Sequence, residues 1–298
     1  MTINDFMKMK NSSTKITVVT CYDYTSAKII NNTKIDVILV GDSVANVMYG
    51  YDSTTSATID MLCAHTKAVN KAIVDDKSKK FLISDLPFMC NRGSLDSIIN
   101  SVQKLIQSGA NAIKIEGCDK QNCEIIEYLT TSGIPVMGHI GLTPQYINTL
   151  GGYKVQGKSN SDAENIINQA IKLEKSGCFS IVLECIPNSL AKEISQKISI
   201  PTIGIGAGPD TDGQVLVLQD LLGMNKDFKP KFVKQYINAY GLIKNALDSY
   251  CLEVKQYKFP NKDTSFNEKI TKVPQSNMSE IEKFINLTQV TIYIFKEY

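Results

Sequence analysis

The segment Asp36-Val-Ile-Leu-Val-Gly-Asp-Ser43 is an apolar run that stops abruptly at a glycine, a carboxylate and a hydroxyl. Four consecutive Val, Ile and Leu residues are typical of a strand that is buried on both faces. A charged side chain directly after such a strand has to face water or a cation. We therefore expect Asp42 and Ser43 to lie where a buried strand ends.

The same pattern occurs four more times along the chain. Each further apolar run ends on an ionisable or metal-binding side chain, and the runs are Phe81-Leu-Ile-Ser-Asp85, Ala112-Ile-Lys-Ile-Glu116, Pro135-Val-Met-Gly-His139 and Ser180-Ile-Val-Leu-Glu184. One such strand would carry little information, because buried strands often end on a polar residue. Five in one chain indicate a shared site.

Eight predicted strands, most of them alternating with predicted helices, indicate the fold. The strands are expected at residues 15–21, 36–40, 81–84, 112–115, 134–138, 181–183, 201–205 and 215–218. The helices are expected at residues 25–31, 58–74, 95–107, 122–130, 161–175, 189–197 and 231–247. This alternation, with strands too apolar for a one-sided sheet, favours a closed (β/α)8 TIM barrel over an open doubly wound sheet. In both folds, functional side chains follow the carboxyl ends of the strands.

The chain of 298 residues is long enough for a large core, and no stretch marks a domain boundary inside it. We expect residues 1–266 to form the catalytic barrel and residues 267–298 a C-terminal extension. Within the extension, Ser279-Glu-Ile-Glu282 predicts the start of a short helix, and residues 289–295 alternate like a strand. This segment could dock on a neighbouring subunit or on the barrel, or it could have no function.

Composition excludes several classes of protein. The net charge is only +2, and acids and bases are spread along the chain, so the basic surface of a nucleic-acid binder is not expected. Because a secretory signal and a membrane-length apolar run are both missing, we expect a cytoplasmic protein with no membrane partner. The eight cysteines form no CxxC pair, which favours reduced structural thiols over a zinc site.

Three carboxylates are expected to meet at the mouth of the barrel, namely Asp42, Asp85 and Glu116. They would repel one another, so one would take up a proton unless a cation lies among them, and oxygen ligands favour Mg²⁺. Lys114 shares a strand face with Glu116 and could pair with a substrate carboxylate. The alternative for each acid is a helix cap or a bond to a neighbouring loop.

Glu184 ends its strand in a position suited to a general base that removes a proton from carbon next to a polarised carbonyl. The alternative is a salt bridge with Lys114 or another lysine. His139 is equally open, because a lone histidine at a strand end is more often part of the hydrogen-bonded structure than a catalyst. His65, inside a predicted helix, is interpreted as structural.

Two glycine-rich segments resemble nucleotide motifs only in part. Gly204-Ile-Gly-Ala-Gly208 lacks the last spacing of a dinucleotide fingerprint, so we expect close backbone packing there. Gly151-Gly-Tyr-Lys-Val-Gln-Gly157 lacks the Ser or Thr that follows the lysine of a Walker loop. We expect this second segment to form a flexible loop over the mouth of the barrel.

Taken together, the motifs resemble those of the 3-methyl-2-oxobutanoate (ketopantoate) hydroxymethyltransferase family. The resemblance runs in order from about residue 14 to about residue 266, and the most specific segments are Gly138-His-Ile-Gly-Leu-Thr-Pro-Gln145 and residues 151–157. The other matching segments are Val40-Gly-Asp-Ser43, Ser84-Asp-Leu-Pro-Phe88, Ile113-Lys-Ile-Glu-Gly117, Leu183-Glu184, Ile203-Gly-Ile-Gly-Ala-Gly208, Thr211-Asp-Gly-Gln214 and Pro230-Lys-Phe232.

The resemblance implies transfer of a hydroxymethyl group from 5,10-methylenetetrahydrofolate to 2-oxoisovalerate, which gives 2-dehydropantoate in pantothenate and coenzyme A biosynthesis. It also implies Mg²⁺, which would stabilise an enolate of the oxo acid, and a homo-oligomer, expected to be a decamer. By position, Asp42 and Asp85 resemble direct metal ligands, and Glu116 resembles a ligand that binds the metal directly or through water.

The remaining residue roles are implied in the same way. Ser43 and Lys114, together with the metal ligands Asp42 and Asp85, resemble the contacts to the oxo acid. Glu184 is similar to the proton acceptor of the family. His139 is expected near the hydroxymethyl group of the substrate or product.

Four places depart from the usual family sequence. They are residues 44–46 directly after Ser43, Thr55-Ser56, Gln219 and Thr264. None of them removes a predicted ligand or the predicted base. Two other functions remain open, a different Mg²⁺-dependent oxo-acid aldolase or lyase on the same barrel and a non-catalytic oxo-acid-binding homologue. The complete set of acids, with Lys114, argues against a decayed site.

Overall fold

The computed structural model describes residues 1–74, 80–227 and 229–266. The chain divides into two compact units, Met1–Tyr240 and Gly241–Tyr298. Within the first unit, eight parallel strands close into a barrel in chain order. The strands are β1 (Ile16–Thr20), β2 (Val37–Val40), β3 (Phe81–Asp85), β4 (Ala112–Glu116), β5 (Val136–Gly141), β6 (Ser180–Glu184), β7 (Thr202–Ile205) and β8 (Gly213–Leu216). The predicted (β/α)8 barrel is therefore confirmed.

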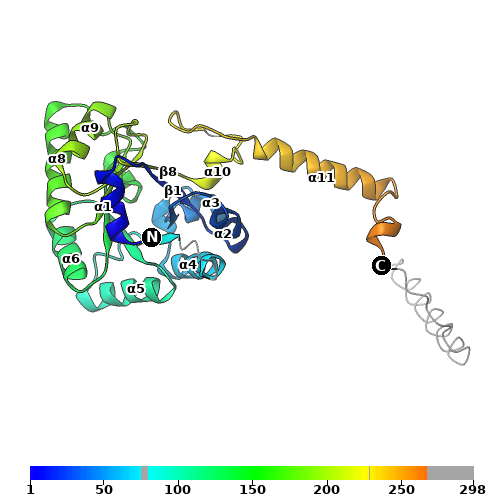
Figure 1. Cartoon of the computed structure of the whole chain (residues 1–298), viewed down its shortest axis with the longest axis horizontal. Helices are drawn as coiled ribbons and strands as arrows, with labels where there is room; N and C mark the ends of the chain where they lie inside the picture. The colour runs from blue at the N-terminus through cyan, green and yellow to red at the C-terminus, as the bar shows by residue number, and fades with distance from the viewer. Residues whose placement is uncertain (75–79, 228, 267–298) are drawn as a thin grey trace, which may run out of the picture. The chain divides into compact units, whose positions relative to one another are not determined.

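Helices run along the outside of the barrel, as Figure 1 shows for α4, α5, α6, α8 and α9. The α-helices are α1 (Ile3–Asn11), α2 (Tyr24–Asn31), α3 (Val44–Tyr49), α4 (Ile59–Ile73), α5 (Leu95–Gln107), α6 (Lys120–Thr131), α7 (Ile147–Leu150), α8 (Asn160–Lys175), α9 (Asn188–Lys197), α10 (Leu218–Leu221) and α11 (Ala239–Lys255). Short 3-10 helices are η1 (Thr54–Ser56), η2 (Pro144–Tyr146) and η3 (Lys262–Thr264).

The local sequence explains where these elements begin. All four residues of β2 are buried, as expected for a strand that has the barrel interior on one side and helices on the other. Five of the outer helices begin at a side chain that accepts a backbone N–H of the first turn, and the capping residues are Asp23, Thr58, Ser94, Asp119 and Ser159. Thr58, one of these caps, is the first residue of the helix predicted at residues 58–74.

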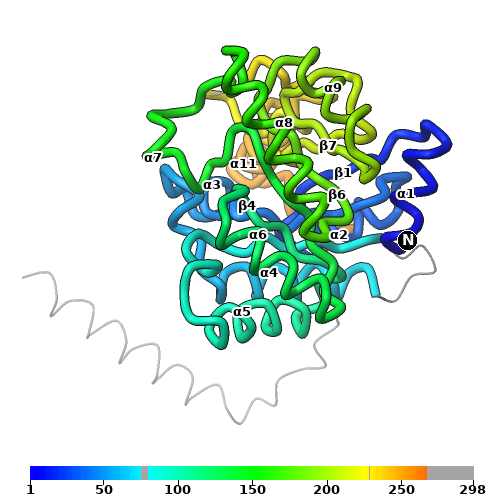
Figure 2. Tube along the Cα trace, turned by 90° about the vertical axis from the view of Figure 1, so that its left-hand side faces the viewer, coloured from blue at the N-terminus to red at the C-terminus, as the bar shows by residue number. Residues whose placement is uncertain are grey.

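Helix α1, which the sequence pattern did not predict, lies against the end of the barrel where the strands begin. Its Phe6 side chain is fully buried, and its ring meets those of Phe81 and Phe179 edge-on, with centroids 5.2 and 5.1 Å away. Figure 2 shows α1 and α7 at opposite ends of the barrel. The carboxyl ends of the strands, which carry the predicted ionisable side chains, therefore lie away from α1.

The helix predicted at residues 231–247 is wrong in its first half, because α11 begins only at Ala239. The backbone amides of Tyr236 and Ala239 donate to the carbonyls of Leu221 and Leu222, each over 2.9 Å. These amides are thus used to attach the segment to the end of α10 instead of forming a helical turn. This tertiary pairing therefore overrides the helix preference of the segment before Ala239.

The last strand also differs from the prediction, since β8 ends at Leu216 and Leu218 already belongs to α10. The pairing of Gly213 with Ile16 sets the start of β8 two residues earlier than the predicted run. The predicted helix and strand of residues 267–298 lie outside the described residues, and the predicted boundary after residue 266 stays a prediction. Across the described parts of the chain, no helix has the length and apolar character needed to cross a membrane.

Candidate active site

Strand register brings the predicted side chains to one end of the barrel. Asp85 pairs with Lys114 across β3 and β4, and Glu116 pairs with His139 across β4 and β5. Glu184 stands opposite Gly141 in the next pair of strands. All seven predicted residues line one cavity of about 120 Å³, and they are Asp42, Ser43, Asp85, Lys114, Glu116, His139 and Glu184. The five strand ends therefore converge on one cavity, as expected.

Lys114 lies among the acids of this cavity and is 5 % exposed. Its Nζ atom is 3.2 Å from Asp85 Oδ2 and 3.5 Å from Glu116 Oε1. Burial alone would lower the pKa of Lys114, but the negative charges of Asp85, Glu116 and Asp42 raise it above its ordinary value. The ammonium group is therefore charged at neutral pH and balances part of the negative charge.

Asp42, unlike Lys114, is buried beside groups of its own charge, which are the other acids. Burial and the charges of Glu116 and Asp85 raise its pKa well above the usual value. Its backbone amide donates to Asp85 Oδ2 over 2.9 Å, which ties the end of β2 to the end of β3. The repulsion expected among three converging carboxylates is thus present, and it falls mainly on Asp42.

Glu116 and His139 form the best-compensated pair of the cavity. His139 Nδ1 lies 3.2 Å from Glu116 Oε1. Burial would raise the pKa of Glu116, but His139 and Lys114 lower it to about 2. Burial and Lys114 would lower the pKa of His139, yet Glu116 and Glu184 raise it to about 9. At neutral pH both groups are charged, so His139 adds a second cation to the site.

Glu184 is the most accessible acid of the group, with 15 % of its side chain exposed. Its Oε2 atom is 3.2 Å from His139 Nε2, although the alignment is not that of a hydrogen bond. Gly141 must lack a side chain here, because a Cβ atom would lie 2.3 Å from the backbone oxygen of Glu184. The close approach of β5 and β6 therefore keeps the Glu184 carboxylate beside the imidazole.

Sequence reasoning missed several residues of the site, among them Tyr22 and Gln145, which contact predicted residues. Tyr22, directly after β1, is buried, and its hydroxyl lies 2.7 Å from Ser43 Oγ. Gln145 donates its side-chain amide to Asp42 Oδ2 over 2.8 Å. The strand-end rule could have found Tyr22 if uncharged polar residues had been included. Gln145 lies in a matching family motif, but nothing in its type points to a role.

The acids of the cavity fit a hard cation in part. Among the described residues, no group of three His, Cys, Asp or Glu side chains could by itself hold a metal ion. Lys114 already neutralises part of Asp85 and Glu116. However, Asp85 Oδ1 is buried and makes no hydrogen bond with any described residue. This unpaired carboxylate oxygen lies beside Asp42, whose pKa is raised by burial and by the neighbouring acids. Such an oxygen is a suitable ligand atom for a divalent ion such as Mg²⁺.

The glycine-rich segment at residues 204–208 packs as predicted, and the flexibility of the segment at residues 151–157 stays a prediction. A Cβ atom at Gly208 would lie 2.4 Å from that of Asn188, which confirms close backbone packing. The other segment is joined to the end of β6 by a 2.9 Å bond from the Gln156 amide to the Cys185 carbonyl. Burial, and then the charges of Glu184 and other acids of the cavity, raise the pKa of Tyr153 in this segment. The segment therefore lies within electrostatic reach of the site.

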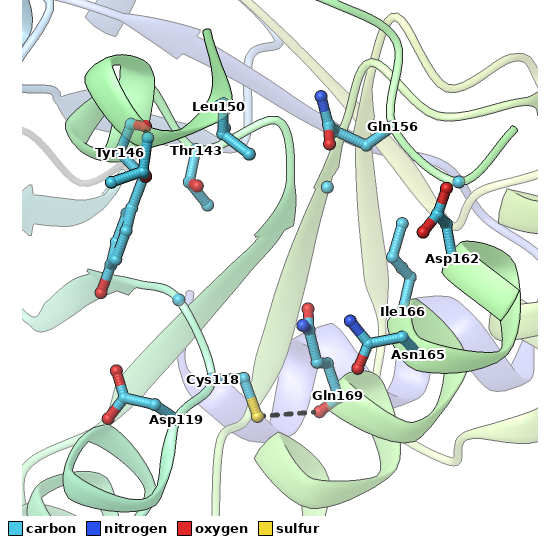
Figure 3. Close-up of a pocket in the computed structure, with 14 residues that line it drawn as sticks. Cys118, Asp119, Thr143, Tyr146, Leu150, Gln156, Asp162, Asn165, Ile166 and Gln169 are labelled. Carbon is cyan, nitrogen blue, oxygen red and sulfur yellow. Dashed lines mark hydrogen bonds between the residues drawn. The ribbon is translucent and has the colours of Figure 1, made fainter.

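His65 and the cysteines match their structural interpretation. His65 bonds through its two ring nitrogens to the backbone oxygen of Tyr22 and to the hydroxyl of Tyr49. All eight cysteines are free thiols. A second cavity of about 310 Å³ lies between the segments after β4 and β5 and helix α8, where Cys118 Sγ is 3.4 Å from the Gln169 carbonyl (Figure 3).

Comparison with solved structures supports the barrel. Phosphonopyruvate hydrolase in complex with oxalate and Mg²⁺ superposes with a TM-score of 0.56 at 11% identity, covering 100% of this chain and 99% of that one. The 2,3-dimethylmalate lyase of the PEP mutase/isocitrate lyase superfamily gives a TM-score of 0.53 at 14% identity, covering 96% and 98%. At such low identity the likeness concerns the fold alone.

Comparison with sequences is far more specific. The profile described as ketopantoate hydroxymethyltransferase matches residues 1–262. A 3-methyl-2-oxobutanoate hydroxymethyltransferase of Legionella pneumophila (strain Lens) is 51% identical over 266 residues, which are 89% of this chain and 100% of the relative. The protein of that name from Francisella tularensis subsp. tularensis (strain WY96-3418) is 53% identical over 88% of this chain and 97% of its own. A match of this extent shows that the chain belongs to the ketopantoate hydroxymethyltransferase family.

Proposed function

We propose that this enzyme transfers a hydroxymethyl group from 5,10-methylenetetrahydrofolate to 3-methyl-2-oxobutanoate, with Mg²⁺ bound, and forms 2-dehydropantoate for pantothenate and coenzyme A biosynthesis in the cytoplasm. The names of the relatives support the reaction. The observation that carries the proposal for this chain is the single cavity in which seven predicted side chains meet. Their charges suit a small anionic oxo acid and a divalent cation.

Asp42 and Asp85 are the proposed metal ligands, and Glu116 is a further ligand, directly or through water. Both oxygens of Glu116 already have partners, Oε1 in Lys114 and His139 and Oε2 in the Gln145 amide, which favours the contact through water. When bound, Mg²⁺ would supply positive charge to the oxygen of the 2-oxo group as negative charge develops there. Four carboxylates facing two cationic side chains leave negative charge that a divalent cation would balance.

The protein side chains bind and orient the oxo acid around this point. The Lys114 ammonium, held between Asp85 and Glu116, is the proposed partner of the substrate carboxylate. Ser43 presents its hydroxyl beside Asp42, and Tyr22 restricts its orientation by a 2.7 Å contact. Because these groups are fixed before the substrate arrives, little reorganisation is needed during the reaction.

Glu184 is the proposed general base, which takes the proton from C3 of the oxo acid. Its carboxylate is the least buried of the four acids, and His139 holds it on one side at 3.2 Å. The carbon that loses its proton then forms a bond to the one-carbon unit of the folate as one of the two carbon–nitrogen bonds of that unit breaks. Water replaces the second nitrogen and supplies the hydroxyl oxygen, so tetrahydrofolate leaves with both nitrogens protonated. His139, with a pKa of about 9, carries a proton at neutral pH and can donate a hydrogen bond to the new hydroxymethyl group.

Deuterium exchange at C3 of 2-oxoisovalerate tests this proposal most directly. The C3-deuterated acid, incubated with the protein, should lose its deuteron to water only when Mg²⁺ is present, and added methylenetetrahydrofolate should yield 2-dehydropantoate. If the deuteron is retained with and without Mg²⁺, the chain is an oxo-acid-binding protein and the proposal fails. Exchange that leads to a product other than 2-dehydropantoate would instead indicate an aldolase or lyase.

The Glu184→Gln variant tests the base within the same assay. An amide of the same shape cannot accept the proton, so exchange should slow by about 10²- to 10⁴-fold. Glu164→Gln, on the exposed face of α8, is the matched control and should exchange at the wild-type rate. A Glu184→Gln protein that exchanges normally would show that another group is the base.

A further inference from the structure

Gln145 is a neutral side chain enclosed among the acids of the active site. It belongs to η2, directly after the loop that follows β5, and is 5 % exposed. Its Nε2 atom donates to Asp42 Oδ2 over 2.8 Å and to the Leu86 carbonyl over 3.1 Å. Its backbone amide donates to Glu116 Oε2 over 3.0 Å. One residue thus touches two of the proposed metal ligands, which come from different strands.

We propose that Gln145 is a positioning residue that holds the Asp42 and Glu116 carboxylates in the arrangement that binds the divalent cation. This inference rests on the proposed function, in which those carboxylates surround the cation. Gln145 makes no contact with the substrate in this scheme. Its role is to orient the two acids before the cation binds.

The pattern of hydrogen bonds decides which carboxylate oxygens stay available. Gln145 uses Oδ2 of Asp42 and Oε2 of Glu116, while Lys114 and the Asp42 amide both use Oδ2 of Asp85. Oδ1 of Asp85 is left without a hydrogen-bond partner among the described residues. A carboxylate with one oxygen anchored presents the other in a fixed direction, which is how neighbours of metal ligands tune a site.

The chemistry of an amide suits this position better than that of a charged donor. A glutamine side chain can donate two hydrogen bonds, and Gln145 uses both, one on Asp42 and one on the Leu86 carbonyl. It adds no positive charge, so it holds a carboxylate without competing with the cation for that charge. Lys114, in contrast, neutralises the acids that it contacts.

Arg92 holds the segment that carries Gln145 in place. It is the only arginine of the sequence, and its Nη2 atom donates to the Tyr146 hydroxyl over 2.7 Å. Its guanidinium also forms an ion pair with Asp119, the capping residue of α6. Figure 3 shows the Tyr146 ring extending toward the side of the second cavity where Asp119 lies. Arg92 therefore connects the segments after β3, β4 and β5, and it reaches Gln145 through the neighbouring Tyr146.

The Gln145→Leu variant removes the side-chain donors and keeps the size of the side chain. Binding of Mn²⁺ to the full-length protein, measured as the loss of the free-ion signal in electron paramagnetic resonance, should weaken by about 10- to 100-fold. The KM for 2-oxoisovalerate at saturating Mg²⁺ should change less than the Mg²⁺ concentration needed for half-maximal exchange. A purely structural role would not produce this difference.

Three further variants make the test independent of folding. Tyr146→Phe deletes only the hydroxyl that Arg92 contacts, and it should weaken Mn²⁺ binding less than Gln145→Leu does. Gln103→Leu, exposed on α5, is the control for the glutamine substitution, and Tyr128→Phe, exposed on α6, is the control for the tyrosine substitution. Both controls should bind Mn²⁺ as the wild type does.

The outcomes separate this inference from the proposed function. The positioning role is supported if the wild type binds Mn²⁺ and Gln145→Leu binds it more weakly, with a smaller loss of affinity in Tyr146→Phe. Equal Mn²⁺ affinity in wild type and Gln145→Leu overturns it and leaves the proposed function intact. A wild-type protein that binds no divalent cation overturns both. If Gln145→Leu does not fold, unchanged affinity in Tyr146→Phe overturns the inference.

Discussion

At the scale of single residues, His139 depends on its neighbours for its charge. Burial and the Lys114 ammonium would lower its pKa, but the carboxylates of Glu116 and Glu184 raise it to about 9, compared with an ordinary value of 6.5. The imidazole is therefore protonated in the folded protein across a pH range in which it is neutral in the unfolded chain. This difference links the stability of the barrel to pH.

The sign of this linkage gives a testable prediction. Because the pKa is raised by folding, the stabilisation is fully present below about pH 6.5 and is lost as the pH rises through about 9. In metal-free protein, the free energy of unfolding lost in His139→Gln should therefore be larger at pH 6.5 than at pH 9.5, as measured by urea denaturation. In Glu116→Gln, which lacks the largest source of the raised pKa, the effect of the histidine substitution should depend less on pH. A cost of His139→Gln that is independent of pH would contradict the assigned charge.

Residue types alone pointed to only part of the site. Asp42, Asp85, Glu116, His139 and Glu184 could be found because five apolar runs of one chain end on an ionisable side chain. Tyr22 and Gln145 follow no such rule, since an uncharged polar residue after a strand is common. Their roles become visible only through contacts between residues far apart in sequence, such as the 2.8 Å bond from Gln145 to Asp42.

At the scale of elements, α1 shows what a short amphipathic helix contributes to a barrel. It has one fully buried side chain, Phe6, which packs against Phe81 and Phe179 where the strands begin. The pattern from Met1 to Lys15 is too polar to predict a helix. The tertiary contact of the Phe6 ring stabilises this helix, which the sequence pattern alone does not predict.

Truncation of this ring is expected to destabilise the barrel without reaching the active site. Phe6→Ala should lower the free energy of unfolding by about 3 to 5 kcal/mol, because it leaves a cavity in a closed aromatic cluster. Ile3→Ala on the same helix is the control and should cost far less, since Ile3 is 39% exposed. Urea denaturation of the two variants compares them, and equal costs would mean that α1 does not close the barrel through Phe6.

The segment before α11 illustrates the opposite case, a helix preference that the structure overrides. Residues 231–238 carry apolar residues at helical spacing, yet the amides of Tyr236 and Ala239 pair with the end of α10. Such pairings cannot be read from periodicity, because periodicity reports only the neighbours along one element.

At the scale of the whole molecule, the family relationship predicts a homo-oligomer, and a decamer is the expected assembly. The Legionella pneumophila relative is matched over its whole length by 266 residues of this chain. The residues beyond the matched region are therefore not needed for what the relatives do.

Deletion of residues 269–298 tests their contribution. We expect the shortened protein to keep the same number of subunits, as judged from its mass in sedimentation equilibrium, and the same rate of Mg²⁺-dependent C3 exchange. The full-length protein, measured at the same concentration, is the reference. A smaller assembly after deletion would assign these residues to a contact between subunits, and a monomeric full-length protein would contradict the predicted decamer.

The sequence alone predicted the fold class and seven of the charged or polar residues that line the cavity, because strand burial and strand ends are properties of local sequence. How these residues act together depends on the tertiary structure. The distances that hold Lys114 between Asp85 and Glu116, and Gln145 against Asp42, depend on the register of separate strands. Charge balance and pKa depend on those distances, and no single strand contains them.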